Sequence, residues 1–168
     1  MKRAGFTLVE ILTAVVIVTI LTAMAVPLYE KTVERSRLAE VRTILDRLQA
    51  SKWAAMDNMG YRHYNTAIEM KHLNVAFSDD VSGHTFSTKA FNYSLLPTGS
   101  VSGIGTIGDA VCARRRNGEY AGTLFLFYGE NGEADPQFLC YDGSTGDCGG
   151  ACCQVYGLSS TAFGCDGV

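Results

Sequence analysis

One carboxylate, Glu10, lies in an otherwise uncharged apolar stretch near the start of the sequence. A charged side chain in an apolar helix costs on the order of a few kcal/mol unless it is paired. A cut between Gly5 and Phe6 would create a new α-amino group at Phe6, with an ordinary pKa of about 8. That cation could neutralise Glu10 of a neighbouring subunit in a bundle of apolar helices. Glu10 is therefore predicted to hold subunits in one axial register, and the alternative interpretation is a carboxylate tolerated near a membrane edge.

The cysteines form the second group of reactive side chains, and all lie in the C-terminal third of the chain. They are Cys112, Cys140, Cys148, Cys152, Cys153 and Cys165. An even number of loop cysteines downstream of an export or membrane segment is typical of disulfides formed outside the cytoplasm. A metal cluster is the alternative, but no Cys-x2-Cys pair repeats and the cysteine-rich tail holds no histidine. We therefore predict disulfides, and neither a metal nor a cofactor.

The connectivity of these cysteines is only partly determined by their spacing. If all six pair within the chain, Cys112 must reach a partner at or beyond Cys140, because no other cysteine precedes it. Cys152 and Cys153 are adjacent, and the geometry of neighbouring residues disfavours a mutual bond. The remaining connectivities stay open.

Three other groups of polar residues carry weaker signals. His63, His72 and His84 share no metal-ligand spacing and are expected to be ordinary loop or surface residues. Arg114–Arg116 is interpreted as a solvated strand edge that guards against pairing, and the alternative is contact with a neighbouring subunit, an acidic surface or DNA. Asp142–Asp147 is a glycine-rich turn with two carboxylates, which is weak evidence for calcium. No recognisable catalytic setting is present, so we do not expect an enzyme.

The overall composition indicates a folded, mildly acidic protein of one ordinary domain. The 168 residues are 47% hydrophobic and 18% charged, with a formal net charge of −3. Loss of residues 1–5 would remove Lys2 and Arg3 and leave 12 basic against 17 acidic residues. A dedicated nucleic-acid binder would normally be basic, so no specific nucleic-acid partner is predicted.

The element that positions Glu10 is expected to be one long helix, from about residue 6 to residue 58, ending near Gly60. Residues 6–29 are apolar all round and just reach the roughly 20 residues needed to cross a bilayer. Residues 30–59 place apolar side chains three or four apart, as one helical face requires. At about 1.5 Å per residue the helix would be about 80 Å long. Its apolar half must be covered by lipid or by neighbouring helices.

Pro27 falls inside this helix, where it lacks an N–H group and crowds the preceding turn. A kink or local melting is therefore expected over Met24–Pro27. The small residues Ala23-Met24-Ala25 could instead form an ordinary signal-peptidase site, which is the alternative interpretation. The helical pattern continues beyond Pro27, however, and this argues against removal of the whole segment.

The rest of the chain predicts a connector followed by a sheet. Residues 60–90 are a polar connector, in which Thr66–Glu69 resembles a capping box for a short helix over residues 67–74 and Ser78–Lys89 is expected to be loop. Within residues 91–168 the pattern changes to period two, and the tail from residue 142 is expected to have little regular structure. The strand candidates are Phe91–Leu96, Ala110–Arg115, Thr123–Tyr128 and Gln137–Tyr141, with a hairpin turn at Gly129–Gly132. We thus expect an α+β fold in which the amphipathic half-helix covers an antiparallel sheet of about four strands.

Lys2-Arg-Ala-Gly5 followed by Phe6-Thr-Leu-Val-Glu10 resembles the class III signal of type IV pilins and pseudopilins. In that family a prepilin peptidase cuts after the glycine and methylates the new N-terminal phenylalanine, here Phe6. The family's assembly glutamate corresponds to Glu10, and its helix-interrupting proline to Pro27. These matches cover roughly residues 1–50, while the remainder resembles the pilin fold only in general layout.

The resemblance implies a leader at residues 1–5 and a single-pass bacterial inner-membrane stage. Assembly into an extracellular filament would follow, with the apolar half-helices in a central bundle. The implied partners are prepilin peptidase, an inner-membrane assembly platform and further copies of the same chain in a helical homo-oligomer. The favoured function is a pilus subunit. The alternatives are a pseudopilin or minor pilin of a type II secretion or DNA-uptake machine, and a single-span anchor for an enzyme or sensor. The role of a filament in adhesion, motility or DNA uptake stays open.

Overall fold

The computed structural model describes residues 7–61, 68–75, 81–95, 100–101, 105–106, 110–128, 137–143 and 149–165. The chain divides into two compact units, residues 1–37 and residues 38–168. One helix, α1 (Leu8–Asn58), begins in the first unit and ends in the second. Helix and antiparallel sheet are both present, so the α+β prediction is confirmed.

The C-terminus of α1 is closed by a glycine motif close to the predicted position. Gly60 has a φ of +73°, a left-handed conformation that glycine adopts without steric cost. The N–H of Tyr61 donates to the carbonyl of Met56 at 2.9 Å, and the N–H of Gly60 donates to Asp57 at 3.1 Å. This pair of bonds is a Schellman motif, which satisfies carbonyls that the helix end would otherwise leave without partners.

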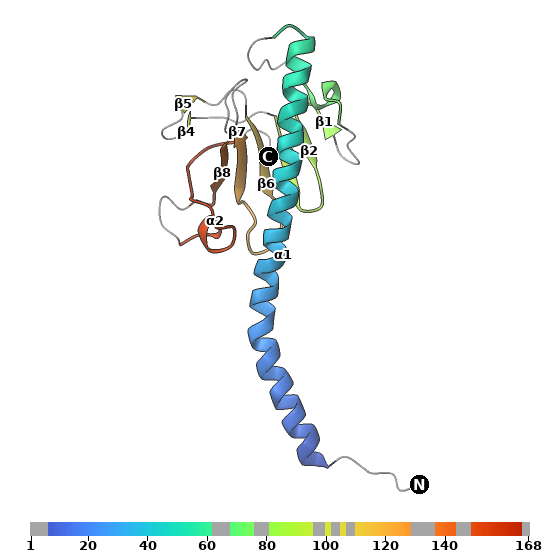
Figure 1. Cartoon of the computed structure of the whole chain (residues 1–168), viewed down its shortest axis with the longest axis vertical. Helices are drawn as coiled ribbons and strands as arrows, with labels where there is room; N and C mark the ends of the chain where they lie inside the picture. The colour runs from blue at the N-terminus through green and yellow to red at the C-terminus, as the bar shows by residue number, and fades with distance from the viewer. Residues whose placement is uncertain are drawn as a thin grey trace, which may run out of the picture. The chain divides into compact units, whose positions relative to one another are not determined.

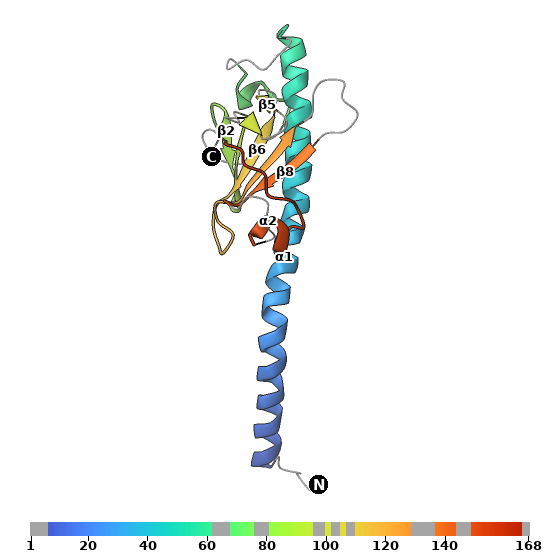
Figure 2. The same cartoon turned by 90° about the vertical axis from the view of Figure 1, so that its left-hand side faces the viewer.

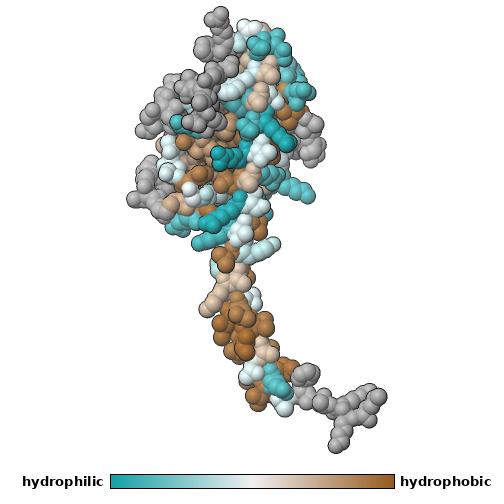
Figure 3. Space-filling model, viewed as in Figure 1, coloured by the Kyte–Doolittle hydropathy of each residue, from teal (hydrophilic) through white to brown (hydrophobic). Residues whose placement is uncertain are grey.

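Residues 8–29 of the first unit form a helix whose apolar surface is exposed. Large apolar side chains from Leu8 to Tyr29 are between 48% and 81% exposed, and they surround the helix on all sides. Figure 3 shows hydrophobic residues dominating this part of α1. The helix continues across Pro27 without a break, so the chain does not melt there, and a kink at Pro27 stays a prediction.

The second unit contains a six-stranded antiparallel sheet, two strands more than the sequence predicted. The strand order is β1-β2-β3-β6-β7-β8. The bounds are β1 Val81–Ser82, β2 Thr85–Ser87, β3 Phe91–Ser94, β6 Val111–Arg115, β7 Leu124–Tyr128 and β8 Gln137–Tyr141. A separate two-stranded ribbon pairs β4 (Ser100–Val101) with β5 (Gly105–Thr106).

The prediction of loop over residues 78–89 was wrong from residue 81 onward, because β1 and β2 form a hairpin there, whereas residues 78–80 lie outside the described residues. Gly83 turns the chain with a φ of +51°, and Phe86 pairs with Val81 in β1 and Tyr93 in β3. Only Phe86 gives this hairpin an apolar anchor, and its ring stacks on Tyr93 with centroids 4.5 Å apart. Strands of two and three residues are too short to show a period-two pattern in the sequence.

Two other local predictions also need correction. The helix expected over residues 67–74 is a single 3-10 turn, η1 (Met70–His72), preceded by Glu69 as its N-cap. Its capping bond comes from the N–H of Glu69 to Nδ1 of His72 at 3.0 Å, whereas Thr66 lies outside the described residues. The tail contains a short helix, α2 (Ala151–Gln154), where little regular structure was expected. The hairpin turn at residues 129–132 lies outside the described residues.

The main core lies between residues 38–58 of α1 and one face of the sheet (Figure 1, Figure 2). Val41, Leu45 and Leu48 are fully buried, at the helical spacing that the sequence predicted. They pack in one cluster with the inward-facing side chains of the sheet, among them Phe91 and Phe125. Each such side chain contributes about 1.5–3 kcal/mol when removed from water, so this cluster stabilises the attachment of the helix to the sheet.

A buried cation joins this helix to the sheet. Lys52 follows the same helical face and is fully buried. Its Nζ donates to the carbonyl of Leu95 at 3.2 Å and to the carbonyl of Ala110 at 2.8 Å. Because a buried ammonium group is costly without partners, these bonds fix the helix against the ends of β3 and β6.

The outer face of the sheet carries a smaller core under residues 160–165, here called the C-terminal segment. Phe163 packs with Ala110, Cys112 and Leu126. The N–H of Thr161 donates to the carbonyl of Cys140 at 2.8 Å, next to a parallel bridge between Cys140 and Ser160. The segment therefore covers the outer face near β8, one of the two edge strands.

Candidate functional site

The carboxylate of Glu10 closes the N-terminus of its own helix. Its Oε2 accepts a hydrogen bond from the N–H of Thr7 at 3.0 Å and another from the Thr7 hydroxyl at 2.9 Å. In return the N–H of Glu10 donates to Oγ1 of Thr7 at 3.3 Å. This reciprocal pattern is a capping box, with Thr7 as N-cap and Glu10 three residues later. Sequence reasoning missed this role, although Thr7-Leu-Val-Glu10 fits the Ser/Thr-x-x-Glu signature.

The capping box leaves the Glu10 carboxylate able to serve a second partner. Among the described residues both of its accepted bonds fall on Oε2, and the side chain is exposed. Two donors from Thr7 hold the group at the first turn of α1, with its negative charge at the positive end of the helix dipole. A cation that approached Oε1 would therefore meet a carboxylate already held in one orientation.

The threonines of the apolar half-helix offer no competing site. The hydroxyls of Thr13, Thr19 and Thr22 donate to the carbonyls of Val9, Val15 and Val18 at 3.0, 3.0 and 2.7 Å. Each bond returns to the preceding turn, so these hydroxyls are satisfied within the helix. From Leu8 to Tyr29 the sequence holds one charged residue, Glu10. This half-helix therefore presents one ionic group on a surface that is otherwise apolar.

The predicted cleavage and methylation positions adjoin this site in the sequence. Gly5 and Phe6 lie outside the described residues, which begin at Thr7. Among the described residues, α1 is the one helix long and apolar enough to cross a membrane, with a mean hydropathy of 2.5 over its best window. None of that window is buried in the protein.

Two disulfides lie in the second unit and attach the C-terminal region to the sheet. Cys112 of β6 pairs with Cys165, and Cys140 of β8 pairs with Cys152 of α2. Cys153 is also disulfide-bonded, whereas Cys148 lies outside the described residues. The first bridge holds the segment that carries Phe163, and the second holds α2 beside β8.

Asp142, the first residue of the sequence considered for calcium binding, has a structural role. Oδ2 of Asp142 accepts the N–H of Cys152 at 2.6 Å, and Oδ1 accepts the hydroxyl of Ser160 at 3.1 Å. Asp142 thus caps α2 and holds the covering segment, while Asp147 lies outside the described residues. In the described part of the chain, no group of three His, Cys, Asp or Glu side chains is placed to hold a metal ion.

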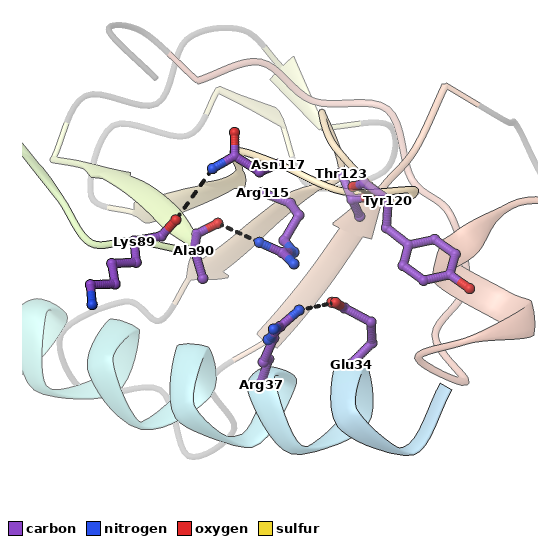
Figure 4. A network of polar contacts seen from close by, with 8 residues as sticks. All are labelled: Glu34, Arg37, Lys89, Ala90, Arg115, Asn117, Tyr120 and Thr123. Atoms are coloured by element: carbon purple, nitrogen blue, oxygen red, sulfur yellow. Dashed lines mark hydrogen bonds and ion pairs between the residues drawn. The ribbon is translucent and has the colours of Figure 1, made fainter. Parts of the chain in front are cut away.

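The interpretation of Arg114–Arg116 as a solvated strand edge was wrong. β6 lies between β3 and β7, so its backbone is paired on both sides. Arg115 is buried on the core side, where its guanidinium lies 5.3 Å from the centre of the Phe91 ring and donates to the carbonyl of Ala90 at 2.9 Å (Figure 4). Asn117 reaches the carbonyl of Lys89 nearby. Sequence alone could not show this, because strand order decides which strands are edges.

Comparison with known families supports a signal at the N-terminus. The family model described as the prokaryotic N-terminal methylation motif matches residues 1–26. A search of curated proteins finds no match, and neither does a search of solved structures. The motif is a methylation signal, and the arrangement of long helix and antiparallel sheet fits the pilin fold. Residues 1–26 of this chain therefore carry the N-terminal signal of the type IV prepilin class.

Proposed function

We propose that this protein is a pilin-type filament subunit. Its precursor would be held in the bacterial inner membrane by the apolar half of α1, cut after Gly5 and methylated at Phe6. The observation that carries the proposal is the methylation motif at residues 1–26 together with the apolar half of α1, residues 8–29. The apolar surface of this half-helix is exposed, and its one charged residue is Glu10. Lipid would cover this surface before assembly, and the half-helices of neighbouring subunits would cover it afterwards.

The chemistry of assembly follows from the geometry around Glu10. Cleavage would place a cationic amine at Phe6, one residue before the Thr7 N-cap. An apolar half-helix slides along others with little preference for one position, because apolar contacts are not directional. A carboxylate in an apolar bundle costs free energy until it meets a cation, so the amine of a neighbour would select one axial position. The bonds from Thr7 pre-organise the carboxylate for that contact.

Processing and surface assembly are tested on the same material. Filaments sheared from cells that express the full chain should contain a protein that begins at N-methylated Phe6. Intact-mass measurement should show the loss of residues 1–5 together with the added methyl group. A mature protein that begins near Val26 would mean ordinary signal cleavage and would overturn the proposal.

The abundance of the chain in the sheared filament fraction distinguishes a pilus subunit from a secretion pseudopilin. A major pilin should be the main protein of the filaments. A processed, methylated chain that stays in the membrane fraction and never enters surface filaments would instead identify a secretion pseudopilin. Both outcomes keep the prepilin signal and differ only in what the subunit builds.

A further inference from the structure

A basic hollow lies on the outer face of the sheet, at the end where β6 passes into β7. Its volume is about 330 Å³, and it is lined by Asn92, Arg114, Arg116, Asn117, Ala121 and Gly122. Arg114 near the end of β6 and Arg116, the first residue after it, both line the hollow, whereas Arg115 is buried on the core side. Among the described residues, no acidic side chain lines the hollow, although the chain as a whole is acidic.

Two polar side chains of this hollow, Arg116 and Asn92, are held in place by hydrogen bonds. Arg116 donates from Nη1 to the carbonyl of Thr88 at 2.8 Å, which fixes one side of its guanidinium. Asn92 lies opposite Arg114 in the register of β3 and β6, and its Oδ1 accepts the hydroxyl of Ser87 at 2.9 Å. With the acceptor of Asn92 occupied, its amide N–H groups are the part of the side chain suited to a ligand. The hollow thus fits a carboxylate better than a cation.

We infer that this hollow binds an acidic segment of a second copy of the chain, residues 129–136. This segment joins β7 to β8 and carries Glu130, Glu133 and Asp135 among eight residues with no basic residue. The inference rests on the proposed function, since it names a contact between heads of one filament. Copies with a net negative charge repel one another unless such complementary patches meet.

The topology of the sheet makes this contact intermolecular. Tyr128 pairs with Gln137, and Phe127 pairs with Val111 at the start of β6, whereas Arg114 and Arg116 lie at its end. Val111 and Arg116 are therefore about 17 Å apart along the extended chain. The strand pair that residues 129–136 connect ends beside Val111, at the opposite end of β6 from the hollow. We therefore assign the contact to a second copy of the chain.

A contact between this hollow and residues 129–136 of another copy joins two different parts of the chain, so it is heterologous. A patch that meets a different patch on the next copy adds subunits in one direction and does not close into a dimer. This geometry suits a filament whose heads repeat along an axis. The Glu10 contact would set the register of the helices, and the arginine hollow would set the register of the heads.

Cross-linking in assembled filaments tests which partner occupies the hollow. A photo-cross-linking amino acid at Asn117 of the full chain should attach to the peptide that contains residues 129–136 of another copy. Attachment to DNA, to a different peptide, or no link between copies would overturn the inference.

Charge reversal gives an independent test. Arg114→Glu should lower the yield of sheared filaments about tenfold, and Glu133→Arg in the same chain should restore most of it. Arg47→Glu changes an exposed arginine of α1 by the same charge and should leave the yield unchanged. A misfolded Arg114 variant would not be restored by a second charge change. Normal yield for Arg114→Glu, while wild-type filaments form, would overturn the inference alone. Absence of wild-type filaments and of processing would instead overturn the proposed function.

Discussion

The two units of this chain differ in the exposure of the apolar side chains of α1, although this one helix belongs to both. Leu12 in the first unit is 60% exposed, whereas Leu45 in the second is fully buried in a core of its own chain. Monomeric soluble proteins rarely expose a large contiguous apolar surface, so the first unit depends on molecules outside the chain. Changes in the first unit should therefore alter assembly, and changes in the second should alter the stability of the head.

The largest expected effect comes from Glu10, and it tests the first half of this comparison. Glu10→Gln keeps the size of the side chain and an oxygen that can accept the bonds from Thr7, but it removes the charge. Membrane insertion and cleavage should persist. The yield of sheared filaments should fall at least tenfold, on the order expected when one partner of a desolvated charge pair is lost.

Thr7→Val is the matched control for this variant, because Thr7 is the other half of the capping box. It removes the side chain that caps α1, at a local cost of about 0.5–2 kcal/mol, and leaves the charge at residue 10. Its filament yield should exceed that of Glu10→Gln. A loss for Thr7→Val as large as that for Glu10→Gln would show that assembly needs the helix cap as much as the charge, and would contradict a dominant role for charge pairing.

The disulfides test the second half of the comparison with an effect of intermediate size. The bridge from Cys112 to Cys165 spans 53 residues, and the bridge from Cys140 to Cys152 spans 12. Replacing the first pair by serine should lower the free energy of unfolding of the head by about 4 kcal/mol, and replacing the second by about 3 kcal/mol. Urea unfolding of detergent-solubilised full-length protein measures both values. Cleavage after Gly5 should not change, and a processing defect in either double variant would contradict the independence of the two units.

Tyr93 gives the smallest expected effect, and it too belongs to the head. Burial, and to a smaller degree the charge of Glu40, raise the pKa of Tyr93 above its ordinary range. The folded protein therefore keeps this phenol neutral at a pH where the unfolded chain releases its proton. This contribution to stability is full below about pH 10 and is lost as the pH rises further.

Tyr93→Phe should reduce the decrease in the free energy of unfolding at alkaline pH. At pH 7 the variant should change the free energy of unfolding by less than about 1.5 kcal/mol, because the ring that stacks on Phe86 remains. Unfolding midpoints in urea at pH 7 and near pH 11 measure the difference. The same alkaline slope in the variant and the wild type would show that other groups cause it.

Much of this architecture could be predicted from the sequence, because the patterns that indicate it extend over many residues. The helix that ends at Asn58 and the buried positions Val41, Leu45 and Leu48 follow from a pattern that repeats over many turns. Gly60 also predicted where the helix ends. The strands β6, β7 and β8, of five residues each, fall within the strand candidates that the sequence predicted.

The remaining features depend on contacts between distant segments. The hairpin of β1 and β2 is too short to show a period and is held by Phe86 against Tyr93. Lys52 looks in sequence like any exposed helical lysine, and its burial depends on two carbonyls 43 and 58 residues away. The burial of Arg115 likewise depends on Phe91 in a neighbouring strand. At the N-terminus the capping box was visible in Thr7 and Glu10, but charge pairing gave Glu10 a sufficient explanation and concealed its local role.

The ammonium group of Lys52 has one further consequence, for how the surface of the head can vary. It bonds the carbonyls of Leu95 and Ala110, so the chain leaves the core and returns to it within about two hydrogen-bond lengths of one atom. The residues on either side of 96–109 are therefore held together from the helix side. We expect an insertion between them to cost about the entropy of closing a longer chain segment, because Lys52 holds both ends in place. The length of the chain between β3 and β6 could therefore change while these two strands keep their positions against α1.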